Sequence, residues 1–296
     1  MRRSILALGG LILWVFSTGA AAQRQLLVYA TILDASGAPP AALTPADVTI
    51  RENGADLKIL KVEPIEWTTK VQILLDNGSG IGSANLSQLR NGLRGLLDAL
   101  PPGLETTIVT TAPQPRFLVR ATSDRQQLLA GVDRLAPDST VGRFVESLGE
   151  ALQRFERDKS DFFGVIVTLG TTVGDNRVID RDINQIFQRI QKRPTTVHVV
   201  MVSTSPGAAA SGGAVQTEVG MQVAKATNGR YESIAAVSRI ATLLPEIGQQ
   251  IAKASQSQAK QFRITAERTG NANEASQISM GVRGGLSVTN VTLGTR

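Results

Sequence analysis

A glycine-rich loop after an aspartate is the segment of this sequence best suited to chemistry. The apolar run Val71–Leu75 ends at Asp76, and Gly78-Ser79-Gly80-Ile81-Gly82-Ser83 follows. Glycine loops between a strand and a helix can cradle phosphate with backbone N–H groups, in the pattern G-x-G-x-x-G. Here Ser83 stands where the third glycine belongs, and Asp76 would repel a phosphate. A nucleotide-binding protein or enzyme that uses the Gly78–Gly82 loop is therefore the weakest of the three hypotheses developed from this sequence.

Hydrolytic chemistry has few candidate residues. The single histidine, His198, lies inside the apolar run 197–200, where a histidine that packs in the core is expected. The sequence has no G-x-S-x-G nucleophile motif, and without cysteine it lacks the usual zinc ligands. Asp180 and Asp182 begin an expected helix, where negative charge stabilises the N-terminus. These observations predict a protein without catalytic residues.

The N-terminus has the three parts of a secretory signal peptide over residues 1–22. Arg2 and Arg3 precede the apolar stretch Ile5–Phe16, and Ala20-Ala21-Ala22 supplies small residues for cleavage. The apolar stretch is shorter than the roughly 20 residues that span a bilayer, so no membrane span is expected after signal cleavage. We expect an exported protein, periplasmic or extracellular, and the absence of cysteine excludes disulfides.

Charge and aromatic content argue against nucleic acid as a partner. The formal charge of +6 includes Arg2 and Arg3, which leaves +4 for the rest of the chain. The basic residues are dispersed rather than clustered as in a nucleic-acid footprint. Aromatic residues make up 4% of the chain, too few for an evident stacking platform.

Alternating apolar patterns divide the remaining chain into three parts. Residues 23–67 form a β-rich lead-in, in which Asn53-Gly54 suits a tight turn. Residues 68–256 alternate strands and helices, and residues 257–296 return to β-character and are expected to pack with the lead-in. The middle part predicts an α/β fold, a doubly wound, mostly parallel sheet flanked by helices. The expected strands are 71–75, 106–110, 117–119, 163–169 and 197–202, and the expected helices are 86–97, 124–135, 141–155, 179–190, 215–227 and 234–255.

Several segments in order resemble bacterial exported proteins with a domain related to von Willebrand factor type A (VWA) domains. They are Leu43-Thr44-Pro45-Ala46-Asp47-Val48, Glu52-Asn53-Gly54, the strand that ends at Asp76, and Ala226-Thr227-Asn228-Gly229-Arg230-Tyr231. The resemblance covers nearly all of the chain after the signal peptide. It implies the VWA (Rossmann-like) fold and, in the family, a metal-ion-dependent adhesion site with the motif Asp-x-Ser-x-Ser.

The resemblance also implies that this copy of the metal site is degenerate. Gly78 and Gly80 replace the two serines, Thr140 matches the threonine of the second loop, and Leu169 replaces the second acid in Thr168-Leu169-Gly170. One carboxylate and one hydroxyl suit Mg²⁺ poorly, so no cofactor is expected. The alternative is Mg²⁺- or Mn²⁺-dependent adhesion through a rearranged site with Asp76, Ser79 and Thr140, to which Ser83 and Asp175 could add ligands.

Without metal, Asp76 is expected to anchor its loop. Backbone N–H groups of the following loop, and the Thr140 hydroxyl, would satisfy the buried carboxylate. Loops at the carboxyl edge of the sheet are then expected to bind a protein partner, since recognition residues often lie on loops of a rigid scaffold. These loops are 76–83, 137–142, 170–176 and 203–213, and their candidate residues are Asp76, Asn77, Ser79, Ser83, Thr140, Thr171 and Asp175.

Trp67 has two interpretations. Tryptophan is enriched at the centres of protein interfaces, so Trp67 could bind a partner. More often such a residue packs at a junction between parts of a chain. Here that junction lies between the β-rich lead-in and the central sheet.

Overall fold

The computed structural model describes residues 24–174, 178–203, 213–258, 261–268 and 277–294. The predicted signal peptide, 1–22, lies outside the described residues. Within them, no helix combines the length and the apolar character that a membrane crossing requires.

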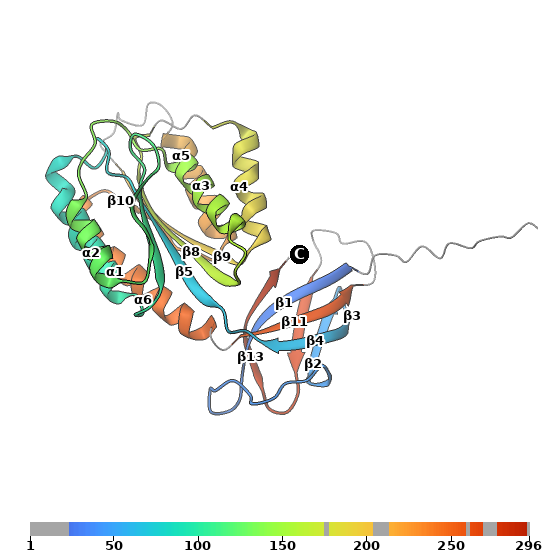
Figure 1. Ribbon diagram of the computed structural model, residues 1–296. Coiled ribbons are helices and arrows are strands. Elements are labelled where there is room, and N and C mark those ends of the chain that lie inside the picture. Colours follow the sequence, from blue (N-terminus) through green and yellow to red (C-terminus); the bar gives the residue numbers. More distant parts are fainter. Residues whose placement is uncertain (1–23, 175–177, 204–212, 259–260, 269–276, 295–296) are drawn as a thin grey trace, which may run out of the picture.

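A six-stranded sheet forms the centre of the α/β part (Figure 1). Its strand order is β10-β9-β8-β5-β6-β7, and every pairing is parallel except that between β6 and β7. All ten residues of β8 are buried, as expected for a strand with helices over both faces. The predicted doubly wound, mostly parallel sheet is confirmed. The bounds are β5 Thr68–Leu75, β6 Glu105–Thr110, β7 Arg116–Thr122, β8 Phe162–Thr171, β9 Thr195–Val202 and β10 Tyr231–Ile234.

Helices cover both faces of this sheet, and each layer has its own apolar core (Figure 1). Three helices, α1, α2 and α6, bury their leucines and isoleucines against one face, and α3, α4 and α5 pack on the other. In α1, Leu89, Leu93, Leu96 and Leu97 recur at helical spacing and are fully buried. The bounds are α1 Leu86–Ala99, α2 Arg125–Arg134, α3 Phe144–Arg157, α4 Asp180–Lys192, α5 Gly213–Ala226 and α6 Ile240–Gln258.

The β-rich segments from the two ends of the chain form one unit of two antiparallel sheets. The first sheet has the order β13-β1-β11-β4 and the second β12-β2-β3, so strands of the lead-in and of the tail pair directly. Their facing apolar side chains form a separate core. The bounds are β1 Arg24–Leu33, β2 Val48–Glu52, β3 Ala55–Asp56, β4 Lys58–Pro64, β11 Gln261–Arg268, β12 Ile278–Val282 and β13 Ser287–Gly294, with short 3₁₀ helices at Pro45–Asp47, Ser83–Asn85 and Val237–Arg239.

Two local predictions in and beside this unit are confirmed. Asn53 and Gly54 both have positive φ, 51° and 86°, as the tight Asn-Gly turn requires. Trp67 packs at the junction, with its ring 5.2 Å from that of Tyr29 in β1 and 5.1 Å from that of Phe163 in β8. Because these neighbours come from both parts of the chain, Trp67 helps to join the β unit to the central sheet.

Two helix predictions were wrong at their start. The helix expected from residue 141 begins at Phe144, because the residues before it pack against the loop that follows Asp76. The helix expected from residue 234 begins at Ile240, since Tyr231–Ile234 pairs with β9 as the sheet's edge strand. Apolar runs this short do not separate strand from helix by periodicity alone.

Candidate functional site

Asp76 lies at the carboxyl end of β5, where three loops meet. Its side chain is 3% exposed. The loop after Asp76 contacts the segment before α3 and the end of β8. The convergence of strand ends at this edge is where open α/β sheets place their ligand sites.

The Asp76 carboxylate is bonded within the protein at both oxygens. The Gly78 N–H donates to Oδ1 at 2.8 Å, and the Thr171 hydroxyl lies 2.8 Å from Oδ2. The prediction that the loop backbone would satisfy Asp76 is thus confirmed for Gly78. The predicted role of Thr140 was wrong, because its hydroxyl donates to Asp138 at 2.6 Å. Thr171 supplies the hydroxyl instead.

Burial raises the pKa of Asp76 above its ordinary value, although the hydrogen bonds from Gly78 and Thr171 oppose the shift. The Thr171 hydroxyl also lies 2.7 Å from the carbonyl oxygen of Val173. A hydroxyl has one hydrogen and cannot donate to both acceptors at once. A protonated Asp76 resolves this competition by donating to the Thr171 oxygen, which then donates to Val173.

Three glycines allow the loops to close around Asp76. A Cβ atom on Gly142 would lie 2.6 Å from Asp76 Cγ and 2.7 Å from Thr111 Oγ1. On Gly78 it would lie 2.5 Å from the Thr140 carbonyl oxygen and 3.0 Å from Asp76 Oδ1, and on Gly80 it would lie 2.3 Å from Thr171 Oγ1. At all three glycines, atoms of the neighbouring loops fill the space that a larger side chain would occupy. We call Asp76, Gly78, Gly80, Gly142 and Thr171 the aspartate anchor.

The aspartate anchor differs from the residues that the motif comparison selected. Leu169 packs in the apolar core beside α1 and α6, and the β8 residue that faces Asp76 is Thr171. In the second loop the close neighbour is Gly142 rather than the side chain of Thr140. One signal in the sequence points away from Leu169 as a ligand, since Leu169 continues the apolar alternation of Val165 and Val167. The place of Gly142 depends on the start of α3 at Phe144, which the sequence pattern did not give.

Asn77 ties the first loop to its neighbours and is also buried. Its side-chain amide donates to the Ala136 carbonyl at 2.9 Å and accepts from the Ala112 N–H at 3.3 Å. The Ser79 N–H donates to the Thr140 carbonyl at 2.7 Å, and Gly142 forms a parallel bridge with Gly174. These bonds hold the three loops together through the protein's own groups.

The glycine loop is a poor cradle for phosphate because four of its N–H groups already have acceptors. Gly78 donates to Asp76 and Ser79 to Thr140, while the Ile81 and Gly82 N–H groups donate to the Gly78 carbonyl at 3.1 and 3.3 Å. A phosphate would have to displace these bonds and would lie beside a buried carboxyl group. This geometry weakens the nucleotide hypothesis for the Gly78–Gly82 loop.

A divalent cation also does not fit the aspartate anchor. The three glycines offer no side-chain ligand, and both oxygens of the one carboxyl group are hydrogen-bonded. In the part of the chain that the structure describes, no group of three His, Cys, Asp or Glu side chains could hold a metal ion. Mg²⁺ and Mn²⁺ prefer several oxygen ligands at an open site.

The remaining predicted site residues separate by exposure. Ser79, Ser83 and Thr140 are exposed at the carboxyl edge, whereas Asp76, Asn77 and Thr171 are buried. Asp175 lies outside the described residues, as does most of the loop 203–213. The exposed residues at this edge are therefore accessible from solvent, whereas the buried ones lie beneath them.

His198 lies in the middle of β9, in register with Val167 of β8. It is 7% exposed, and burial lowers its pKa to about 4, with a smaller contribution from Arg230. Its Nδ1 accepts a hydrogen bond from the Arg230 N–H at 3.2 Å. The histidine is thus neutral at pH 7 and bonded to a backbone N–H group, in line with the core role expected of it.

The fold is that of VWA domains. A von Willebrand factor type A protein from Catenulispora acidiphila superposes with a TM-score of 0.52 at 11% identity, over 93% of this chain and 75% of that chain. The pilus adhesin SpaC from Lactobacillus rhamnosus GG gives a TM-score of 0.50 at 10% identity, over 70% of this chain and 34% of that chain. No protein-family model matches this sequence, and no curated protein matches it significantly. Likeness at these identities concerns the fold alone.

Proposed function

We propose that this chain is an exported, non-enzymatic protein-interaction module that binds its partner without metal. The observation that carries the proposal is the aspartate anchor, in which the protein's own groups occupy the place of a metal. The anchor holds Ser79, Ser83 and Thr140 exposed on loops of a rigid sheet. Loops fixed in this way are the usual place for recognition.

Three further observations support parts of the proposal. The fold is shared with part of the pilus adhesin SpaC. The single histidine is buried, and no hydrogen bond links it to the aspartate anchor within the described residues, which supports the proposal of a non-enzymatic module. The export signal expected at residues 1–22 supports a periplasmic or extracellular location.

The alternative is metal-dependent adhesion through Asp76, Ser79 and Thr140. It would require the Ser79 side chain to turn towards Asp76, and the Thr140 hydroxyl to leave Asp138, to which it lies 2.6 Å away. Asp76 would also have to lose its bonds to Gly78 and Thr171. We therefore favour direct contacts between this edge and a protein partner.

Site-specific photo-crosslinking tests the proposal. A photoreactive amino acid at Ser79 or Ser83 is expected to yield the same crosslinked protein, in equal amount with and without EDTA, when the chain is made in its own cell. Ser123 and Ser279, which are exposed but lie away from this edge, serve as matched control positions. The double variant Ser79→Arg/Ser83→Arg should remove the partner, whereas Ser123→Arg/Ser279→Arg should retain it.

Two results would contradict the proposal. A partner that crosslinks equally at Ser123 and Ser279 would show that the carboxyl edge has no special role. A product that disappears with EDTA and returns with Mg²⁺ would favour the metal-dependent alternative.

A further inference from the structure

A second candidate site lies at the amino edge of the sheet, opposite the aspartate anchor. A cavity of about 780 Å³ opens between the α/β part and the β unit. Its walls are the starts of β8 and β9, one stripe of α6, and the strands β1, β11 and β13. This volume falls within the roughly 300–1,000 Å³ range of small-molecule sites.

The stripe of α6 that faces the cavity is polar. It consists of Gln250, Lys253, Ala254, Ser257 and Gln258, which recur at helical spacing. A helix stripe that packs against another part of a protein is ordinarily apolar. The composition of this stripe therefore indicates contact with a polar ligand or water rather than with a protein layer.

Two buried side chains on the cavity wall have unused hydrogen-bonding groups. Gln261 is 6% exposed, and its Oε1 has no hydrogen-bond partner. His198 uses Nδ1 to accept from the Arg230 N–H, so the proton of the neutral ring is on Nε2. No hydrogen bond from Nε2 is found within the described residues. The wall thus offers one acceptor and one donor that protein groups leave unfilled.

The charged residues that line the cavity are cations. Arg193, Arg230 and Lys253 line it, and none of the lining residues in the described part of the chain is Asp or Glu. Arg230 is paired with Glu232 at 2.7 Å and Glu246 at 3.0 Å. Arg193 and Lys253 have no carboxylate partner among the described residues, and this excess of positive charge favours an anionic ligand.

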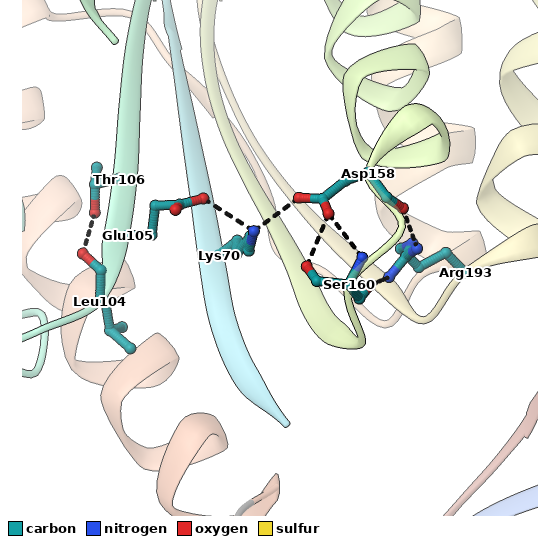
Figure 2. Close-up of polar contacts among 7 residues, drawn as sticks. All are labelled: Lys70, Leu104, Glu105, Thr106, Asp158, Ser160 and Arg193. Atoms are coloured by element: carbon teal, nitrogen blue, oxygen red, sulfur yellow. Dashed lines mark hydrogen bonds and ion pairs between the residues drawn. The ribbon is translucent and has the colours of Figure 1, made fainter. Parts of the chain in front are cut away.

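Figure 2 shows the polar contacts that hold Arg193 beside Ser160 and Asp158. Its guanidinium donates to the backbone carbonyls of Ser160 at 2.9 Å and Asp158 at 2.8 Å, and lies 4.1 Å from the centre of the Phe162 ring. The Asp158 carboxylate points instead to Lys70, at 2.7 Å (Figure 2). Arg193 is therefore fixed in place by neutral groups, and within the described residues it forms no ion pair.

Aromatic rings do not form a binding face in this cavity. Tyr29 and Phe163 line it but are only 5% and 3% exposed, because they pack against Trp67. A nucleobase would find no ring on which to stack. Hydroxyl groups suit the wall better, since one hydroxyl can donate to Gln261 and another can accept from His198.

We infer that this cavity binds a small hydroxylated carboxylate, of the sugar-acid class. Its hydroxyls would bond Gln261 and His198, and its carboxylate would lie near Lys253. The site is separate from the proposed partner surface, so either can exist without the other. Because both parts of the chain line the cavity, a bound ligand would fix their relative orientation.

Saturation-transfer NMR on the full chain tests this inference with glucuronate, galacturonate and gluconate. Glucose serves as the probe without charge, and glutarate as the probe without hydroxyls. At least one sugar acid is expected to receive saturation and to bind more tightly than either control probe. Gln261→Leu should weaken its binding about fivefold, the equivalent of one hydrogen bond. Lys253→Gln should weaken it about threefold, as for an exposed ion pair.

Lys225→Gln is the matched control, since Lys225 is exposed on α5 and does not line the cavity. It should leave the affinity unchanged. No transfer to any of the three sugar acids would overturn the inference. Transfer of equal strength in wild type, Gln261→Leu and Lys253→Gln would overturn it as well, because the contact would then lie elsewhere. Lys253→Gln alters an exposed side chain and is expected to fold even if Gln261→Leu does not.

Discussion

Replacing Gly142 by alanine is expected to destabilise the protein by about 2–3 kcal/mol, the upper range for overpacking in a closed interior. The added Cβ would lie 2.6 Å from Asp76 Cγ and 2.7 Å from Thr111 Oγ1, so the second loop would have to move away from Asp76. Urea unfolding followed by circular dichroism measures the loss. The bridge between Gly142 and Gly174 should weaken with it.

Gly149→Ala is the control for this substitution. Gly149 lies within α3, and its Cβ would meet only two Ile186 atoms, at 3.8 and 4.0 Å. Alanine in a helix interior is favoured over glycine by about 1 kcal/mol, so this variant should equal or exceed the wild type in stability. If Gly142→Ala is as stable as Gly149→Ala, the loops do not close on Asp76 as described.

The second large effect is expected at Asp76, where alanine and asparagine should differ. Asp76→Ala leaves the buried Gly78 N–H without its acceptor, removes the partner of Oγ1 of Thr171 and opens a small cavity, which together cost about 2–4 kcal/mol of unfolding free energy. Asparagine keeps an oxygen for Gly78 and can donate to the Thr171 hydroxyl. Asp76→Asn should therefore lie within about 1 kcal/mol of the wild type at neutral pH.

The protonation of Asp76 is checked by the pH dependence of the unfolding free energy of the wild type and of Asp76→Asn. Its pKa is raised by burial, so the folded state binds the proton more tightly than the unfolded chain does. Wild-type stability relative to Asp76→Asn should then rise as the pH falls through the folded pKa towards the unfolded value of 3.8. An asparagine variant as damaged as the alanine variant would instead show that the negative charge itself is required.

Patterns that depend on burial could be predicted from the sequence. The run 71–75 predicted a central strand, and the spacing of Leu89, Leu93, Leu96 and Leu97 predicted α1, because strands and helices expose different periodicities to a core. β-character at both ends of the chain gave the expectation that the tail packs with the lead-in, and in the structure β1 and β4 both pair with β11. Trp67 had two interpretations, and the one that places it at the junction agrees with its contacts to Tyr29 and Phe163.

The neighbours of Asp76 could not be predicted as well, because the answer depended on register. A shift of two residues separates Leu169, which is in the core, from Thr171, which bonds Asp76. To place Gly142 beside Asp76, the start of α3 had to be predicted to within three residues. Helix starts predicted from sequence are uncertain by about that much. The close approach of Gly78, Gly80 and Gly142 is a tertiary feature that local patterns do not contain.

Calorimetric titration of Mn²⁺ into chelator-treated protein, beside Asp76→Asn, tests most directly whether the aspartate anchor replaces a metal. We expect no saturable heat from either protein, and no change of the unfolding midpoint with Mn²⁺ or Mg²⁺, since a bound ion would stabilise the folded state. Saturable binding in the wild type that is lost in Asp76→Asn would contradict the account and would show that the loops open to form a metal site.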